Sequence, residues 1–209
     1  MPKPTLYYRP GACALAPHIL LHWLNVDHDA VLAERDNAEL LAISPSGAVP
    51  AFRTEDGRGL TQVGAILQHI ARMAGRADYL GGTDETLQDE VAMWVSFFTG
   101  DFHPAFWPYF VPFQYTTDPS EQMHPAIRDA GIALIRANLD KMNRHLDGRE
   151  VFLGTGRTVV DAYAVPMLRW AKRIETVQVN DFPAVRHYYE AITQDSDVQA
   201  AMRVQGIEA

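Results

Sequence analysis

The chain has 209 residues, of which 47% are hydrophobic and 21% charged, a composition typical of globular proteins. Its formal net charge of −8 and pI of about 5.4 argue against nucleic acid or an anionic membrane surface as the main partner. The sequence has no apolar run long enough to cross a bilayer, and residues 1–10 lack the pattern of a signal peptide. We therefore expect a cytoplasmic protein that does not bind membranes.

The first part of the chain alternates strand and helix patterns. Residues 5–8 favour a strand that ends at an Arg-Pro-Gly turn, and apolar residues at helical spacing predict a helix from there to about residue 25. A strand over residues 28–32 should lie parallel to the first, because a helix connects them. A short helix at 37–43, a hairpin of strands 49–53 and 59–61, and a helix at 65–73 follow. The order predicts a mixed four-stranded sheet flanked by helices.

From residue 83 onward the pattern is helical only. Long helices are expected over residues 83–98 and 125–146, and Pro183 suits the first position of a further helix. Thr158-Val-Val-Asp161 matches a capping box at another helix start. The glycine-containing segment 76–82 reads as a linker. The predicted fold class is therefore an α/β N-terminal domain over residues 1–76 plus an all-α C-terminal domain over residues 84–209.

Cys13 is the only cysteine of the chain, which excludes an intrachain disulfide. It lies between a turn and a predicted helix start, where backbone N–H groups and the helix dipole favour a thiolate, so we expect a lowered pKa. In a thioredoxin-like βαβ unit this position holds the first cysteine of the redox motif, but Ala14-Leu15-Ala16 supplies no second thiol. The alternative is an inert buried residue.

The eight histidines form no motif with metal-ligand spacing. His18 and His22 lie one helical turn apart, but no carboxylate accompanies them in the sequence. Ordinary positions on an amphipathic helix explain this pair, and the sequence predicts no metal site.

Val49-Pro50 begins the third predicted strand. A cis-proline at this place in a thioredoxin-like fold would leave the preceding backbone N–H and C=O free to bind an extended peptide thiol beside Cys13. The alternative is a trans proline in a turn.

Taken together, these residues resemble the bacterial beta-class glutathione S-transferases of the cytosolic glutathione transferase superfamily. The resemblance covers nearly the whole chain in order, through Pro10-Gly11-Ala12-Cys13, Pro17-His18, Ser44-Pro45-Ser46-Gly47-Ala48-Val49-Pro50, the segment 158–163 and Gln205-Gly206-Ile207. It implies a cytosolic glutathione transferase fold, in which a thioredoxin-like domain binds glutathione as co-substrate. It also implies a homodimer, without metal, that detoxifies small hydrophobic electrophiles.

The resemblance also implies roles for single residues. Cys13 matches a cysteine beside the glutathione sulfur, His103 matches a histidine directed at that sulfur, and Tyr8 matches a tyrosine near the site. The glutathione-binding residues would be Val49, Pro50, Gln62, Val63 and Arg35, with Val49 supplying the backbone clamp.

Three positions depart from the family pattern. Gln62 stands where an acidic residue is common, so it can hydrogen-bond the γ-glutamyl group but cannot form an ion pair with its ammonium. Arg35 is the only basic residue of a shortened segment that often carries a lysine, and Pro104 replaces the lysine usual after the family histidine. The sequence therefore preserves the thiol end of the site and alters its charged ends.

The segment 97–113 is rich in aromatic residues and is interrupted by proline at 104, 108 and 112. These prolines should break or kink a helix. One interpretation is a helical core. The other is that Phe106, Trp107 and Phe110, together with Trp170, line a flat apolar site for the acceptor substrate.

The predicted function is conjugation of glutathione thiolate to hydrophobic electrophiles, with thiol-disulfide exchange through Cys13 as a further possibility. The alternatives are a glutathione-dependent thiol reductase, lyase or dehalogenase on the same scaffold, or a non-catalytic binding protein. A glutathione-independent thiol peroxidase is a third alternative and would need a sulfenic acid at Cys13.

Overall fold

The computed structural model describes residues 2–154 and 156–209. Four short strands form one mixed sheet in the order β2-β1-β3-β4. The central strand β1 (Thr5–Tyr8) pairs parallel with β2 (Asp29–Leu32), in the register Thr5 to Asp29. It pairs antiparallel with β3 (Ala51–Arg53), which forms the predicted hairpin with β4 (Gly59–Thr61). The expected mixed four-stranded sheet is thus confirmed.

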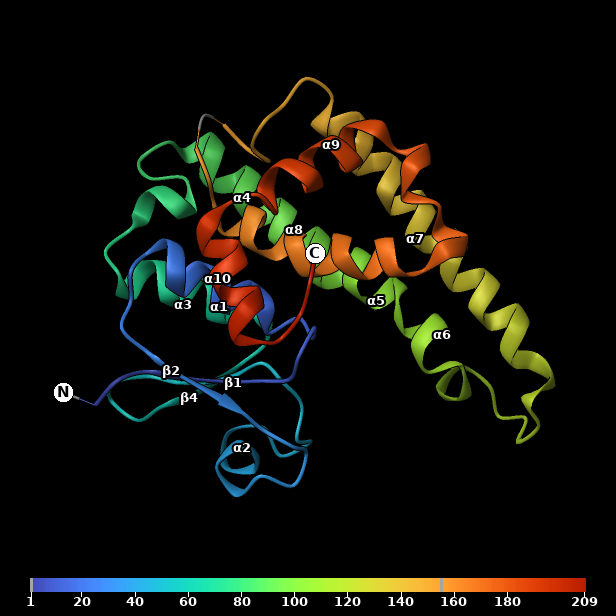
Figure 1. Cartoon of the computed structure of the whole chain (residues 1–209), viewed down its shortest axis with the longest axis horizontal. Helices are drawn as coiled ribbons and strands as arrows, with labels where there is room; N and C mark the ends of the chain where they lie inside the picture. The colour runs from blue at the N-terminus through green and yellow to red at the C-terminus, as the bar shows by residue number, and fades with distance from the viewer. Residues whose placement is uncertain (1, 155) are drawn as a thin grey trace.

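Helices make up most of the remaining chain (Figure 1). In the sheet-containing part they are α1 (Leu15–Trp23), α2 (Ala38–Ile43) and α3 (Val63–Met73), followed by the short turn η1 (Ala77–Leu80). The second part contains the longer helices α4 (Glu85–Phe97), α7 (His124–Leu146), α8 (Val159–Arg173), α9 (Pro183–Ile192) and α10 (Ser196–Val204). Shorter elements connect them: η2 (Phe98–Phe102), α5 (His103–Ala105), α6 (Trp107–Phe110), η3 (Pro112–Tyr115), η4 (Glu121–Met123), η5 (Glu175–Val177) and η6 (Val179–Asp181).

The two faces of the sheet are covered by different helices. Side chains alternate along β1, so Leu6 faces the large core with α1 and α3, whereas Tyr7 faces a smaller cluster with Leu40 of α2. Figure 1 shows α2 below the sheet, with α1 and α3 above it. The arrangement places the start of α1, and therefore Cys13, at the edge of the sheet that faces the helical part.

The start of α8 carries the capping box that the sequence predicts. Asp161 is fully buried, and its carboxylate accepts hydrogen bonds from the backbone N–H of Phe152 and of Thr158, both at 2.8 Å. The hydroxyl of Tyr188 donates a third, also at 2.8 Å. One carboxylate therefore joins α8 to α9 and to the loop that follows α7.

The aromatic segment is broken into short pieces, as its prolines predict. A π-helical turn, η2, ends α4, and the brief helices α5 and α6 follow it. In Figure 1, α6 and the first turns of α7 form an arm that extends away from the sheet.

Both parts of the chain share one hydrophobic core. Helix α1 packs against α8 and α10, and core residues from both parts form a single cluster. Hydrogen bonds also cross between the parts: for example, Trp170 Nε1 donates to the Gly11 carbonyl at 2.7 Å, and Trp23 Nε1 donates to Asp195 at 2.9 Å. The division expected between residues 76 and 84 falls around η1. No helix of the described residues combines the length and the apolar character needed to cross a membrane.

Candidate functional site

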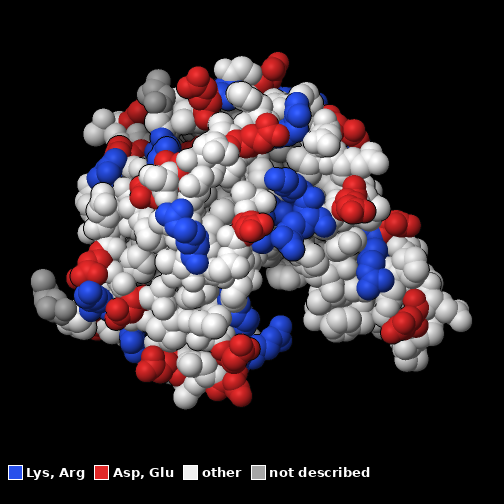
Figure 2. All heavy atoms as spheres, viewed as in Figure 1, with Lys and Arg blue, Asp and Glu red and all other residues white. Residues whose placement is uncertain are grey.

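A cavity of about 420 Å³ lies where the sheet edge meets the helical part. Its sheet side comes from the start of α1, the loop between α2 and β3, and the junction of β4 with α3. Its helical side comes from η2, from α5 and α6, and from α8. Figure 2 shows an open indentation between the lobe that contains the sheet, where Lys or Arg atoms border it, and the mostly uncharged near side of the arm that contains α6. The lining residues are Cys13, Ile43, Ser44, Pro45, Ser46, Ala48, Val49, Pro50, Thr61, Gln62, Val63, Thr99, His103, Pro104, Trp107 and Tyr163.

Cys13 lies at the floor of this cavity and is only 7% exposed. Its thiol donates a hydrogen bond to the Val49 carbonyl, with the sulfur 3.7 Å from the oxygen. Burial raises the pKa of the Cys13 thiol to about 12, and the backbone N–H groups of Cys13 and Ala14 offset only part of that rise. The lowered pKa expected from the helix start is therefore wrong, because loss of solvation outweighs the helix N-terminus at this depth.

His103 faces the same cavity from the helical side. Its Nδ1 lies 3.0 Å from the hydroxyl of Tyr163 on α8, and its ring packs against Trp107 with 5.4 Å between ring centroids. Burial lowers the pKa of His103 to about 4, so the ring is neutral at pH 7. Its Nε2 is buried and has no hydrogen-bond partner in the part of the chain that the structure describes. A buried polar atom of this kind is rare unless a ligand or water completes it.

The sheet side of the cavity presents backbone rather than charge. The Val49–Pro50 peptide bond is cis, as predicted, and both residues line the cavity. Gln62 lies between β4 and α3 with a φ of 70°, a left-handed conformation that is uncommon for residues other than glycine. Such conformations concentrate at binding sites, where neighbouring structure holds them in place. Val63 completes this wall.

A tight turn over residues 44–47 forms the rim beside this wall. The N–H of Gly47 donates to the carbonyl of Ser44 at 2.8 Å, and a β-carbon at Gly47 would collide with the carbonyl of Arg35. Arg9, which the sequence analysis did not single out, connects the segment after β2 with the turn over residues 44–47. Its guanidinium donates hydrogen bonds to the carbonyls of Ala33 and Gly47. Arg35 itself is exposed and adjoins the rim through its backbone, and its side chain is absent from the cavity lining.

Four other predicted site residues also lie outside this cavity. Tyr8 shares the face of β1 that carries Leu6, and its hydroxyl donates to the Val204 carbonyl at 3.3 Å, which places Tyr8 against α10 and outside the lining of this cavity. Phe106 is fully buried and belongs to the core, which makes its assignment to the acceptor site wrong. Phe110 and Trp170 line a neighbouring cavity of about 480 Å³. Trp107, 40% exposed, is the one predicted aromatic that lines the cavity of Cys13.

Tyr163 is the main lining residue that the sequence did not single out. It lies on α8 at the same helical face as Trp170, seven residues later, and that spacing was the available signal. Burial raises the pKa of Tyr163, so its hydroxyl stays protonated and can donate to His103.

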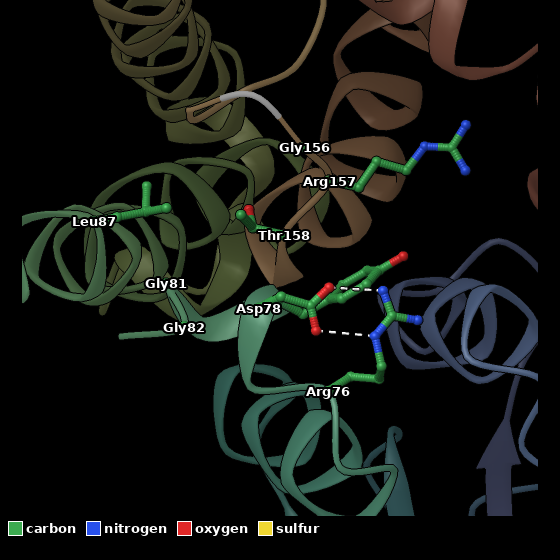
Figure 3. Close-up of a pocket in the computed structure, with 9 residues that line it drawn as sticks. Arg76, Asp78, Gly81, Gly82, Leu87, Gly156, Arg157 and Thr158 are labelled. Atoms are coloured by element: carbon green, nitrogen blue, oxygen red, sulfur yellow. Dashed lines mark hydrogen bonds and ion pairs between the residues drawn. The ribbon is translucent and has the colours of Figure 1, made fainter. Parts of the chain in front are cut away.

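A further cavity of about 440 Å³ lies between η1 and the start of α8 (Figure 3). Its two arginines already have partners: Arg76 forms two hydrogen bonds with Asp78, at 2.6 and 2.9 Å, and Arg157 pairs with Asp195 at 2.7 Å. In Figure 3 the Arg157 side chain points away from the Arg76–Asp78 pair. None of its described lining residues carries a thiol or an imidazole, so the chemistry concentrates in the cavity of Cys13 and His103.

A thioredoxin-like sheet with a cis-proline beside a cysteine, packed on an all-helical part, defines the class of protein. Family models for the glutathione S-transferase N-terminal domain and C-terminal domain match residues 11–73 and 125–191. The chain belongs to the glutathione S-transferase family. It is 31% identical over 207 residues to glutathione S-transferase GST-4.5 of Xanthomonas campestris, covering 97% of this chain and 98% of that protein.

Solved structures agree with this assignment. The glutathione S-transferase of Xylella fastidiosa superposes with a TM-score of 0.88 at 33% identity, covering 98% of this chain and all of that one. The beta-class glutathione S-transferase of Sphingomonas chungbukensis superposes with a TM-score of 0.85 at 28% identity, covering 98% of this chain and 100% of that one. A sphingomonad glutathione S-transferase, solved in complex with glutathione, also superposes with a TM-score of 0.85 at 28% identity. The match covers 98% of this chain and 100% of that one.

Proposed function

We propose that this protein is a glutathione transferase that binds glutathione in the cavity of Cys13 and His103 and directs its sulfur to small hydrophobic electrophiles. His103, which lines that cavity and whose buried Nε2 has no hydrogen-bond partner among the described residues, carries the proposal. Its neighbour in the cavity, Val49, supplies backbone groups that suit an extended peptide. The relatives named as glutathione S-transferases support the same activity.

The proposed role of His103 is to donate a hydrogen bond to the glutathione thiolate. In this proposal the hydroxyl of Tyr163 donates to Nδ1, so the ring proton is on Nε2, the nitrogen that has no partner among the described residues. With a pKa of about 4, the ring is a weak base at pH 7. The thiol proton therefore leaves to solvent through the open cavity, and Nε2–H stabilises the remaining thiolate. The thiolate then attacks carbon while the leaving group departs.

Cys13 is proposed as a neutral neighbour of the glutathione sulfur and not as the nucleophile. Its thiol is protonated at pH 7 because burial raises its pKa to about 12. A protonated thiol exchanges poorly with disulfides, since the thiolate is the attacking form. The acceptor is proposed to lie against Trp107, the exposed aromatic side chain at the helical side of the cavity.

The test compares His103→Ala with the wild-type chain. Glutathione binding is measured by calorimetry, and the pKa of the bound thiol by the ultraviolet absorbance of the thiolate. Loss of a hydrogen bond to a charged sulfur should raise the pKa of bound glutathione by about 1–2 units and slow conjugation of an aryl halide in proportion. The control is His187→Ala, since His187 is exposed on α9. An unchanged thiol pKa in His103→Ala would contradict the role, and absence of glutathione binding in the wild type would contradict the function.

We also propose a cytoplasmic homodimer that detoxifies electrophiles, as the family resemblance implies. Light scattering at micromolar concentration tests the assembly, and a mass of one chain would contradict it.

A further inference from the structure

Three histidines meet beside α1, and none of them lines the cavity of Cys13 and His103. His18 and His22 lie one turn apart on α1, and His28 comes from the loop that leads into β2. One ring nitrogen of each lies within 4.8 Å of the other two. The sequence shows only the pair on the helix, because the third histidine joins it through the turn of the chain after α1.

Two of these rings, those of His28 and His22, each have a nitrogen available to bind a ligand. The Nδ1 of His28 lies 2.8 Å from the carbonyl of Val26, so this nitrogen carries the proton and donates, and Nε2 keeps its lone pair. Metal-binding histidines commonly use such a backbone carbonyl to fix the ring. The Nε2 of His22 is buried and has no hydrogen-bond partner among the described residues. A group bound between the rings would satisfy this nitrogen.

Burial favours the neutral form of two of the rings, those of His18 and His22, and the neutral form is the one that binds a metal. His18 is 1% exposed, and burial, together with the neighbouring rings of His28 and His22, lowers its pKa to about 3. Burial and His28 also lower the pKa of His22. From α10, the negative charge of Asp197 and the positive charge of Arg203 act on His22 in opposite directions.

We propose that His18, His22 and His28 form a binding site for one divalent transition metal ion of the zinc type, separate from the glutathione cavity. Imidazole nitrogens suit such ions, and three histidines with a fourth, solvent-derived ligand are an established zinc set. His22 and His28 are half-buried, which leaves room for that fourth ligand. Zinc–nitrogen bonds of about 2.0–2.1 Å place the ligand nitrogens about 3.3 Å apart, so each ring would move inward by at most about 1 Å.

Binding would also involve the C-terminal segment. The amide nitrogen of Gln205 lies 3.2 Å from Nδ1 of His18, and its oxygen accepts the N–H of Gly11 at 3.3 Å. When His18 binds a metal through Nε2, Nδ1 carries the proton, and the Gln205 amide turns its oxygen toward it and gives up the hydrogen bond from the Gly11 N–H. The metal would thereby tie together α1, the entry to β2 and the residue that follows α10.

The test titrates the metal-free full-length protein with Zn²⁺ against a chromophoric chelator, and separately with Co²⁺ by visible absorption. The wild type should bind one ion per chain and melt at a higher temperature with Zn²⁺ present. Co²⁺ should give the intense ligand-field bands of a four-coordinate nitrogen site, without a sulfur charge-transfer band. Weak six-coordinate bands, a sulfur band or absence of binding at micromolar Zn²⁺ would each overturn the proposal.

Variants locate the site. His22→Ala and His28→Ala should each weaken Zn²⁺ binding at least about tenfold. These positions are half-buried, so the variants are tolerated better than one at fully buried His18. His187→Ala is the matched control for an exposed histidine, and Cys13→Ser is the control for the only thiol; both should bind Zn²⁺ like the wild type. Unchanged affinity in His22→Ala and His28→Ala, or loss of binding in either control, would overturn the site.

Discussion

Two effects act on the Cys13 thiol in opposite directions. The backbone N–H groups at the helix start favour its thiolate, and burial disfavours it. Because its pKa is raised to about 12, the thiolate fraction should increase about tenfold for every pH unit between 7 and 10. We expect the rate of alkylation by iodoacetamide to rise with the same slope and without a plateau in this range. Mass spectrometry of the single adduct per chain measures this rate.

An ordinary exposed thiol would level off near its pKa of about 8.5, so a small thiol reagent measured in parallel serves as the control. A plateau for the protein below pH 9 would show that the helix N-terminus outweighs burial. In that case thiol-disulfide exchange through Cys13 would return as a competing mechanism.

Sequence patterns located the residues of the site better than they described its chemistry. The turn before α1 and the proline at the start of β3 placed Cys13 beside Val49, since a βαβ unit fixes both positions. The pKa of Cys13 depends on how much of the helical part covers it, which no local pattern contains. Tyr8 was misplaced for a similar reason: alternation along β1 points it toward α10, and that helix is nearly 200 residues away in the chain.

At the scale of single elements, the capping box of α8 should be one of the most sensitive points for stability. Asp161→Ala removes the acceptor of two backbone N–H groups and of the Tyr188 hydroxyl, leaving buried donors without partners. We expect a loss of at least about 3 kcal/mol in the free energy of unfolding, measured by urea denaturation. Asp129→Ala on the exposed face of α7 is the control and should change it by less than about 0.5 kcal/mol. A similar small effect at both positions would contradict this reasoning.

The broken aromatic segment separates two neighbouring side chains into different roles. Trp107 is 40% exposed in the cavity, whereas Phe106 is fully buried. Trp107→Ala should lower kcat/KM for an aromatic acceptor about tenfold, because it removes a stacking surface, while leaving the melting temperature nearly unchanged. Phe106→Ala should instead cost about 3–5 kcal/mol of stability. Stability curves and acceptor kinetics on both variants distinguish these outcomes, and equal stability losses would contradict the assignment.

The sequence could not separate these two aromatic residues. Prolines indicated that the helix breaks, but the direction of each side chain after a break depends on the local turn. Here a π-helical turn over residues 98–102 shifts the helical face before His103, so a periodicity read from α4 does not continue into α5 and α6.

At the scale of the whole molecule, the sheet-containing part and the helical part are joined by packing rather than by a linker alone. Helix α1 buries one face against the sheet and another against α8 and α10, and the chain returns to α1 at Gln205. The first 76 residues taken alone would leave that second face exposed to water. The two parts expected from the sequence therefore differ in architecture but share one hydrophobic core.

This shared core predicts a single cooperative unfolding transition. In urea, far-ultraviolet circular dichroism, tryptophan fluorescence and exposure of the buried Cys13 to alkylation should give the same midpoint. Three of the four tryptophans lie in the helical part, while Cys13 reports on the sheet-containing part, so the probes sample both. A fragment of residues 1–76 should lack a cooperative transition, because the apolar face of α1 has no partner there. Separate midpoints for fluorescence and alkylation, or cooperative unfolding of the fragment, would show instead that each part is stable by itself.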